Sequence, residues 1–128
     1  SGPTSYSPLI KKAIQLVEEK KRFHILIIIG DGAVTSCEET IAAIVEASNY
    51  PLATLVIGVG DGDRKDYPDD PWFEMKKFCS ELPERKFDNF KFIQFDKSLK
   101  TEEFVKKALL DMPAAYKYCQ ENMQLLKQ

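Results

Sequence analysis

The sequence predicts an α/β domain with a doubly wound, mainly parallel sheet that carries helices on both faces. Three apolar runs have the length and composition of strands, and each is followed by apolar residues at helical spacing. Crossovers through helices place neighbouring strands parallel. Two of the runs end in the same tripeptide, Gly-Asp-Gly, at residues 30–32 and 60–62. A carboxylate on a glycine turn at the carboxyl end of a buried strand is typical of ligand and metal sites in open α/β sheets.

A helix and a strand are predicted before the first Gly-Asp-Gly. Ser7 and Pro8 supply a capping serine and a proline in the first turn. The apolar face of this helix consists of Leu9, Ile10, Ala13, Ile14 and Val17. Residues 23–29 are then apolar at nearly every position, which is the pattern of a strand buried on both faces.

The second helix and the second strand follow the same order. Ser36 and Glu39 form a capping box three residues apart. We expect the inner face of this helix to consist of Ile41, Ala42, Ile44 and Val45. The second strand is predicted over residues 52–59, and the polar segment 61–70 after it is interpreted as a solvated loop that contains Asp61.

The last part of the chain predicts two helices around a third strand at residues 90–95. Pro71 leads into a short helix, and Trp72-Phe73 is interpreted as helix packing, with a partner-contact patch as the alternative. Thr101 opens a second helix, for which the inner residues are Phe104, Val105, Ala108 and Leu109. Pro113 interrupts this helix, and the apolar stripe continues at Tyr116, Cys119, Met123 and Leu126.

The strand at residues 23–29 has too few predicted neighbours for its composition. Sequential strands tend to lie side by side, so only the strand at 52–59 would pair with it and its other flank would stay open. We therefore expect residues 1–128 to be the carboxyl-terminal part of a single larger domain whose first strands lie upstream. An alternative hypothesis is that a fragment of this kind self-associates through the edge of the Phe23–Ile29 strand.

Composition excludes several classes of partner. The 128 residues carry a formal net charge of −2 and no basic stripe with interleaved aromatic residues, which argues against nucleic acid. The longest apolar run, residues 25–29, is far shorter than the roughly 20 residues that a bilayer requires, so we expect no direct membrane insertion. Cys37, Cys79 and Cys119 are widely spaced and accompany one histidine, His24, which argues against a zinc site or a disulfide framework and favours a reducing compartment.

Catalytic motifs are also missing from the sequence. It contains no Gly-x-Ser-x-Gly, no phosphate-binding Gly-x-x-x-x-Gly-Lys-Ser/Thr and no Gly-x-Gly-x-x-Gly that opens a helix. His24 lies inside a predicted strand without a second histidine, so a structural role is favoured. Phosphoryl transfer at Asp31 stays an open alternative, although the acidic pair and the lysine that this chemistry needs are not evident. We predict a non-enzymatic binding module with no catalytic residues.

Several motifs in their order along the chain carry a family resemblance. They lie at residues 2–6, 27–32, 44–48, 50–52, 59–62 and 85–93. Together they resemble the von Willebrand factor A-type domain of copines and of the copine-like ubiquitin ligases of the RGLG type, a Rossmann-like fold. Residues 87–90 with Met112-Pro113 and Tyr116-Lys117 are somewhat closer to the ligase branch.

The resemblance implies a metal-ion-dependent adhesion site at the carboxyl end of the sheet. In this family three loops hold Mg²⁺ or Mn²⁺, and the metal positions matched here are Thr4 and Asp31. The first loop, of the type Asp-x-Ser/Thr-x-Ser, has no counterpart in these residues. One hydroxyl and one carboxylate are too few ligands for magnesium, so we expect weak metal binding or none by this chain alone.

The resemblance also implies a partner and a location. In the complete domain an acidic residue of a partner protein would occupy the open coordination site of the metal. The expected location is the cytoplasm, with membrane attachment supplied by C2 domains outside this chain if the parent is a copine. If the parent is of the RGLG type, the domain would be the substrate-recognition part of a ligase whose separate RING domain recruits the conjugating enzyme.

Overall fold

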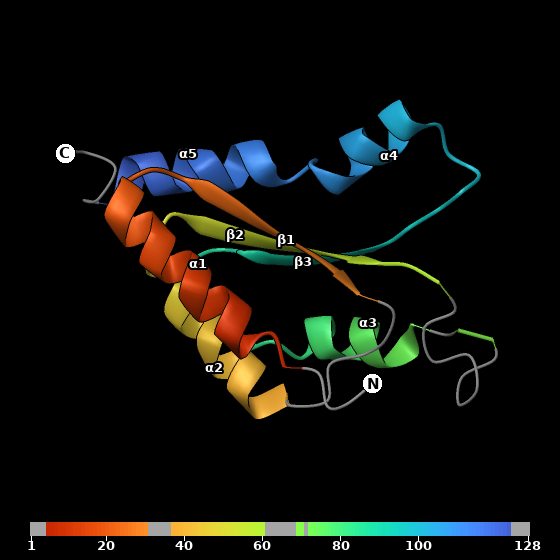
Figure 1. Ribbon diagram of the computed structural model, residues 1–128, viewed down its shortest axis with the longest axis horizontal. Coiled ribbons are helices and arrows are strands. Elements are labelled where there is room, and N and C mark those ends of the chain that lie inside the picture. The colour runs from red at the N-terminus through yellow and green to blue at the C-terminus, as the bar shows by residue number, and fades with distance from the viewer. Residues whose placement is uncertain (1–4, 31–36, 61–68, 71, 124–128) are drawn as a thin grey trace.

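The fold is a three-layer α/β sandwich around a parallel sheet. The computed structural model describes residues 5–30, 37–60, 69–70 and 72–123. The elements in these ranges are α1 (Ser7–Lys20), β1 (His24–Gly30), α2 (Cys37–Ala47), β2 (Leu52–Gly58), α3 (Phe73–Ser80), β3 (Phe90–Gln94), α4 (Thr101–Ala108) and α5 (Met112–Asn122). The strand order is β1-β2-β3, with α1, α2 and α3 on one face and α4 and α5 on the other (Figure 1). The predicted α/β class and parallel sheet are confirmed.

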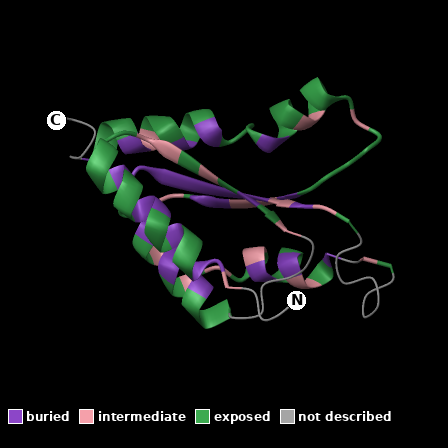
Figure 2. Cartoon of the chain, viewed as in Figure 1, coloured by how far each residue is buried: buried purple, intermediate pink, exposed green. Residues whose placement is uncertain are grey.

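Strand β2 is the centre of the sheet. It pairs with β1 from His24↔Leu52 to Gly30↔Gly58, and with β3 from Thr54↔Phe90 to Gly58↔Gln94. Every residue of β2 except Ile57 is buried, as the continuous purple ribbon in Figure 2 shows. A strand that is covered on both faces and paired on both edges requires apolar residues at successive positions, which the sequence of β2 supplies.

Two hydrophobic clusters cover the two faces of β2. The larger cluster joins the sheet to α1, α2 and α3, and its fully buried side chains include Ile10, Val17, Ile44, Leu52, Val56, Trp72 and Met75. The smaller cluster lies under α4 and α5 and consists of Ala53, Leu55, Ile93, Ala108 and Met112. Lys91 links β3 to the layer of α4 and α5. Its Nζ lies 3.1 Å from Asp111 Oδ2 and donates a 3.2 Å hydrogen bond to the Lys107 carbonyl.

The start of α1 differs from the prediction. Tyr6 is the N-cap residue and makes no side-chain capping bond, so Ser7 is the first helical residue and not the cap. The Ser5 hydroxyl accepts a 3.2 Å hydrogen bond from the Ser7 N–H instead. The predicted cap of the second helix, Ser36, lies outside the described residues.

The buried faces of three helices were predicted only in part. In α1 the predicted residue Leu9 is 48% exposed, and the other four are buried. In α2 the buried residues are Thr40, Ala43, Ile44 and Ala47, so of the predicted inner face only Ile44 is fully buried. The buried face is therefore rotated relative to the predicted one. Thr40 lies on the buried side, where its hydroxyl accepts a 3.1 Å hydrogen bond from the Tyr6 N–H. In α4 only Ala108 is buried, and the predicted inner residues Val105 and Leu109 are exposed.

Strand β1 lies at the edge of the described sheet, with one flank unpaired, as the sequence predicted. The prediction that it is buried on both faces is wrong for these residues. Ile28 is 7% exposed, but Ile25, Ile27 and Ile29, which alternate with it, are 38%, 52% and 68% exposed. These three side chains share the face of the sheet that carries α4 and α5, whose helices leave this face of β1 partly uncovered. None of the described helices is long and apolar enough to cross a membrane.

The three cysteines are expected to react at very different rates. Cys119 is fully buried and Cys79 is half-buried, whereas Cys37 is exposed. Loss of solvation raises the pKa of Cys79 to about 11, against a smaller lowering by Arg85, and burial raises the pKa of Cys119 to about 11. At pH 8 only about one in a thousand of such thiols is the reactive thiolate.

A thiol titration with a chromogenic disulfide at pH 8 should therefore show one fast phase and two phases at least about tenfold slower. The Cys37→Ser variant should lose the fast phase alone. A fast phase that persists in this variant would contradict the assignment. Raising the pH toward 11 should accelerate the two slow phases, because deprotonation of Cys79 and Cys119 is completed only above their raised pKa values.

Candidate functional site

The carboxyl ends of the three strands meet at one edge of the sheet. β1, β2 and β3 end at Gly30, Gly58 and Gln94, and the register aligns these three residues across the sheet. In parallel sheets this edge is where ligands bind, because the crossover loops diverge there. The predicted ligands Asp31 and Thr4, and the second aspartate Asp61, lie outside the described residues. The described residues beside Thr4 and Asp31 define the surroundings of this candidate site.

The segment that precedes α1 is fixed to the start of α2. The Tyr6 N–H donates a hydrogen bond of 3.1 Å to Oγ1 of Thr40, a side chain with no exposed surface. The Ser5 hydroxyl lies 3.5 Å from the Glu39 carboxylate. The segment next to Thr4 is therefore fixed to α2 by side chains of its first turns.

Tyr6 also reaches the end of β1. A Cβ atom built at Gly30 would lie 3.4 Å from the Tyr6 hydroxyl oxygen, so the phenol lies against this glycine. Tyr6 is 3% exposed. Gly30 directly precedes Asp31, and Tyr6 follows Thr4 by two residues. The structure thus brings together two residues that lie within two positions of the predicted metal ligands in the sequence.

The tie between Tyr6 and Thr40 was missed in the sequence. A threonine inside an amphipathic helix gives no signal of burial, because the residue is equally common on solvated faces. Thr40 was therefore not among the residues predicted for the inner face of this helix, although it is buried. Thr40 accepts a hydrogen bond from the buried Tyr6 N–H, and only the fold shows that these two groups are neighbours.

The end of β2 is closed by aromatic packing. Trp72 is 1% exposed, and its ring lies 5.3 Å from that of Phe92, centroid to centroid. A Cβ atom at Gly58 would come within 2.9 Å of both rings. The predicted packing is confirmed for Trp72, whereas Phe73 is 44% exposed. A side chain at position 58 would require the two rings to shift.

A polar hollow of about 600 Å³ lies beyond the end of β3, and its charged lining consists of Asp96, Lys97 and Lys107. The Asp96 carboxylate accepts hydrogen bonds from the Ser98 hydroxyl at 2.6 Å and the Ser98 N–H at 2.9 Å, and these bonds lower its pKa. Because its carboxylate is engaged with its own turn, Asp96 is interpreted as a turn-stabilising residue.

The residues that the structure describes contain no group of three or more His, Cys, Asp or Glu side chains that could hold a metal ion. His24 begins β1, at the edge opposite to the candidate site, and its Nδ1 lies 2.8 Å from the Arg22 carbonyl. The described part of the carboxyl edge offers glycine, aromatic and hydroxyl groups, an arrangement suited to shaping a binding surface.

Comparison with known proteins gives consistent matches over the chain. The copine family model matches residues 1–128. The E3 ubiquitin-protein ligase RGLG5 of Arabidopsis thaliana is 40% identical over 138 residues, which cover 91% of this chain and 30% of the ligase. Copine family protein 2 of Caenorhabditis elegans is 41% identical over 132 residues, covering 99% of this chain and 2% of that protein. RGLG4 of A. thaliana is 40% identical and is covered to 35%. The chain therefore spans about a third or less of the length of these relatives.

The contacts at the ends of β1 and β2 predict that two glycine substitutions will change the free energy of unfolding by different amounts. Gly58→Ala should lower the free energy of unfolding by about 1–3 kcal/mol, because its methyl group would overlap the rings of Trp72 and Phe92. Gly30→Ala, at the paired position of β1, should change it by less than about 1 kcal/mol, because among the described residues the added methyl group would meet only the Tyr6 hydroxyl, at 3.4 Å. Chemical denaturation of both variants measures the difference. Equal losses at the two positions would show that the rings do not close over Gly58.

Proposed function

Because this chain belongs to the copine family, we propose that it is part of a protein-interaction module that binds its partners through a divalent metal ion at the carboxyl edge of the sheet. The observation that carries the proposal is the contact between Tyr6 and Gly30. This contact joins Tyr6, which follows Thr4 by two positions in the sequence, to Gly30, which directly precedes Asp31. In the proposed site the Thr4 hydroxyl and the Asp31 carboxylate bind Mg²⁺ or Mn²⁺.

The chemistry of the two ligands fits a hard cation. Magnesium is bound in proteins by one or two carboxylates together with hydroxyl groups and waters, at near-octahedral geometry. Such an ion can exchange one water for a carboxylate oxygen of another protein, and the resulting contact is charge-assisted. We therefore propose an acidic residue as the group that the partner protein contributes.

The rest of the metal site is proposed to come from an upstream strand that pairs with the free edge of β1. A parallel strand at this edge would end beside Gly30 and would place its following loop next to Asp31. Two observations support such a strand. The free edge of β1 carries no charged residue or proline that would protect it, and the relatives are about three times as long as this chain or longer.

Covering β1 would also stabilise the domain. Ile25, Ile27 and Ile29 retain 38%, 52% and 68% of their surface. Complete burial of one isoleucine side chain contributes about 1.5–3 kcal/mol, so covering the remaining surface of the three would contribute on the order of 3 kcal/mol. We propose that residues 1–128 are the carboxyl-terminal part of one larger domain of the von Willebrand factor A type.

A second candidate function is substrate recognition within a ubiquitin ligase. It is favoured by the identity of 40% to proteins named E3 ubiquitin-protein ligases. Zinc-binding RING domains need closely spaced cysteine and histidine ligands. This chain has three cysteines about forty residues apart and one histidine, so we propose that it carries no ligase activity of its own. In a ubiquitination assay of the parent protein, it would determine which substrate is modified.

Metal titration tests the incomplete site. By isothermal titration calorimetry, residues 1–128 should bind Mg²⁺ and Mn²⁺ with a Kd weaker than about 1 mM, because one hydroxyl and one carboxylate leave most of the octahedral shell to water. A longer polypeptide that includes the upstream strand should bind at least about tenfold more tightly. Thr4→Ala and Asp31→Ala should each remove this gain, whereas Asp61→Ala serves as the control and should retain it. Submillimolar binding by residues 1–128 alone would contradict the proposal.

The free edge of β1 predicts that this chain self-associates at high concentration. Light scattering after size exclusion should show a mass that rises with concentration, since two copies can cover each other's apolar strands. Ile27→Lys should shift the chain toward the monomer. Leu9→Lys is the matched control, because Leu9 is 48% exposed but lies on α1 and not on β1. A clean monomer at all concentrations would mean that the edge is not available for pairing.

A further inference from the structure

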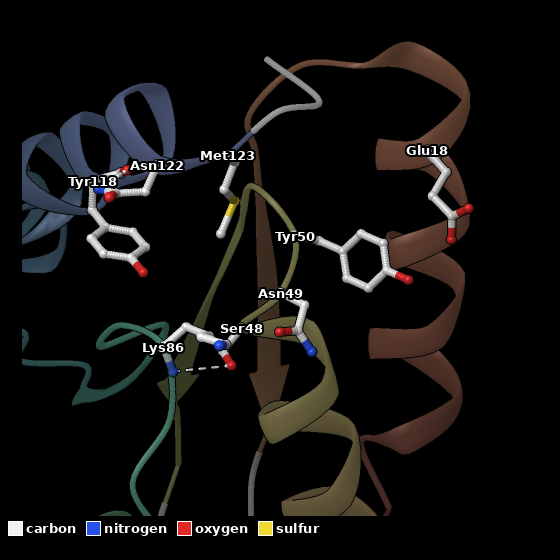
Figure 3. A pocket seen from close by; sticks show the side chains of 8 residues that line it. All are labelled: Glu18, Ser48, Asn49, Tyr50, Lys86, Tyr118, Asn122 and Met123. Carbon is white, nitrogen blue, oxygen red and sulfur yellow. Dashed lines mark hydrogen bonds between the residues drawn. The ribbon is translucent and has the colours of Figure 1, made fainter. Parts of the chain in front are cut away.

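A second hollow lies at the amino edge of the sheet, opposite to the proposed metal site. Its volume is about 500 Å³, within the range of ligand-binding pockets. Its walls come from α1, from the turn between α2 and β2, from the segment before β3 and from α5 (Figure 3). Elements from both layers of helices thus converge at the edge where the strands begin, and the metal-binding motif has no part in this hollow.

Buried hydrogen bonds fix the floor of this hollow. Ser48 is 1% exposed, and its hydroxyl donates to the Val45 carbonyl at 2.7 Å and accepts from the Lys86 N–H at 3.3 Å. Asn89 is 2% exposed and donates from Nδ2 to the Ile44 carbonyl at 2.9 Å. The end of α2 and the segment before β3 are therefore joined, which gives a hollow that exists before any ligand binds.

The two ends of the hollow carry opposite charges. Figure 3 shows Tyr50 with its hydroxyl directed toward Glu18 on one side, and Tyr118 on the side of Lys86. The ring of Tyr118 is held in place by stacking on Phe87, at 5.1 Å between centroids and 22° between planes. Each end thus combines an aromatic ring with one charged side chain, and the two charges differ in sign.

Oriented acceptors lie between these ends. Nδ2 of Asn49 donates to the Glu46 carbonyl at 3.2 Å, and Nδ2 of Asn122 donates to the Tyr118 carbonyl at 2.9 Å. These bonds fix both amide groups, and within the described ranges neither Oδ1 accepts a hydrogen bond from another protein group. Fixed amide oxygens are suited to accept hydrogen bonds from the backbone N–H groups of a peptide.

We propose that this hollow binds an extended peptide segment that carries one basic and one acidic side chain. The basic side chain lies against Tyr50 and pairs with Glu18, since a cation is attracted both by an aromatic face and by a carboxylate. The acidic side chain pairs with Lys86 beside Tyr118. A peptide with charges of one sign would place a repulsive charge at one of the two ends.

Titration by nuclear magnetic resonance tests this site without interference from the metal edge. Isotope-labelled chain, kept in EDTA, is titrated with capped peptides in which one Arg and one Glu are separated by one to three alanines. Saturable shifts are expected at the signals of Ser48, Asn49 and Asn122. Peptides in which Gln replaces both charged residues should bind more weakly, by about twofold to fivefold for each charge removed. Absence of saturable shifts with every mixed-charge peptide would overturn the proposal.

Matched substitutions separate the two ends. Glu18→Gln should weaken binding of the mixed-charge peptide by about twofold to fivefold and remove its preference over the peptide that lacks Arg. Glu19→Gln, on the neighbouring exposed position of α1, should leave both unchanged. Lys86→Gln should in the same way remove the preference for Glu, and its backbone N–H bond to Ser48 is kept. An equal effect of Glu19→Gln and Glu18→Gln would show non-specific charge attraction and would overturn the proposal.

Discussion

The burial of β2 is the constraint on which the rest of the molecule depends. This strand is paired on both edges, and its alternate residues belong to different clusters, with Leu52 and Val56 under α1–α3 and Ala53 and Leu55 under α4 and α5. Its buried backbone groups need hydrogen-bond partners, and β1 and β3 supply them in parallel register. That register aligns Gly30, Gly58 and Gln94 at one edge, and it gathers the strand starts and the ends of α1 and α2 at the other. Both proposed binding regions are consequences of this single alignment.

The sequence predicted the elements well where one physical signal decided them. The strands expected at 23–29, 52–59 and 90–95 are β1, β2 and β3 to within about one residue, because apolar runs between glycines and polar turns have few alternatives. Pro113 does separate α4 from α5 and lies in the first turn of the latter. Prediction was weaker for helix faces. The sequence around Ile41 and Ala42 is apolar on two sides, and the buried side of α2 includes Thr40, which bonds a backbone donor 34 positions away.

For the candidate metal site, the sequence predicted the ligand residues but not the contacts around them. Thr4 and Asp31 were assigned by resemblance, and neither residue is in the described ranges. What the structure adds is the contact of Tyr6 with Gly30, which no periodicity could reveal because it joins a helix cap to a strand end. The amino-edge hollow gave no sequence signal at all. Its lining mixes polar, aromatic and apolar side chains from segments between residues 18 and 123, so only the fold makes these side chains neighbours.

The two edges of a parallel sheet can carry separate functions because the length of the strands holds them apart. At the carboxyl edge, affinity would come from a metal ion and would disappear with EDTA. At the amino edge, it would come from two charged side chains and fixed amide groups, and it would depend on salt, since exposed charges are screened within about 8 Å at physiological ionic strength. A partner that uses both edges would show both dependences at once. Removing the metal and raising the salt concentration would then each lower the affinity for the partner. Applied together, they would lower the affinity by the product of the two separate fold-changes.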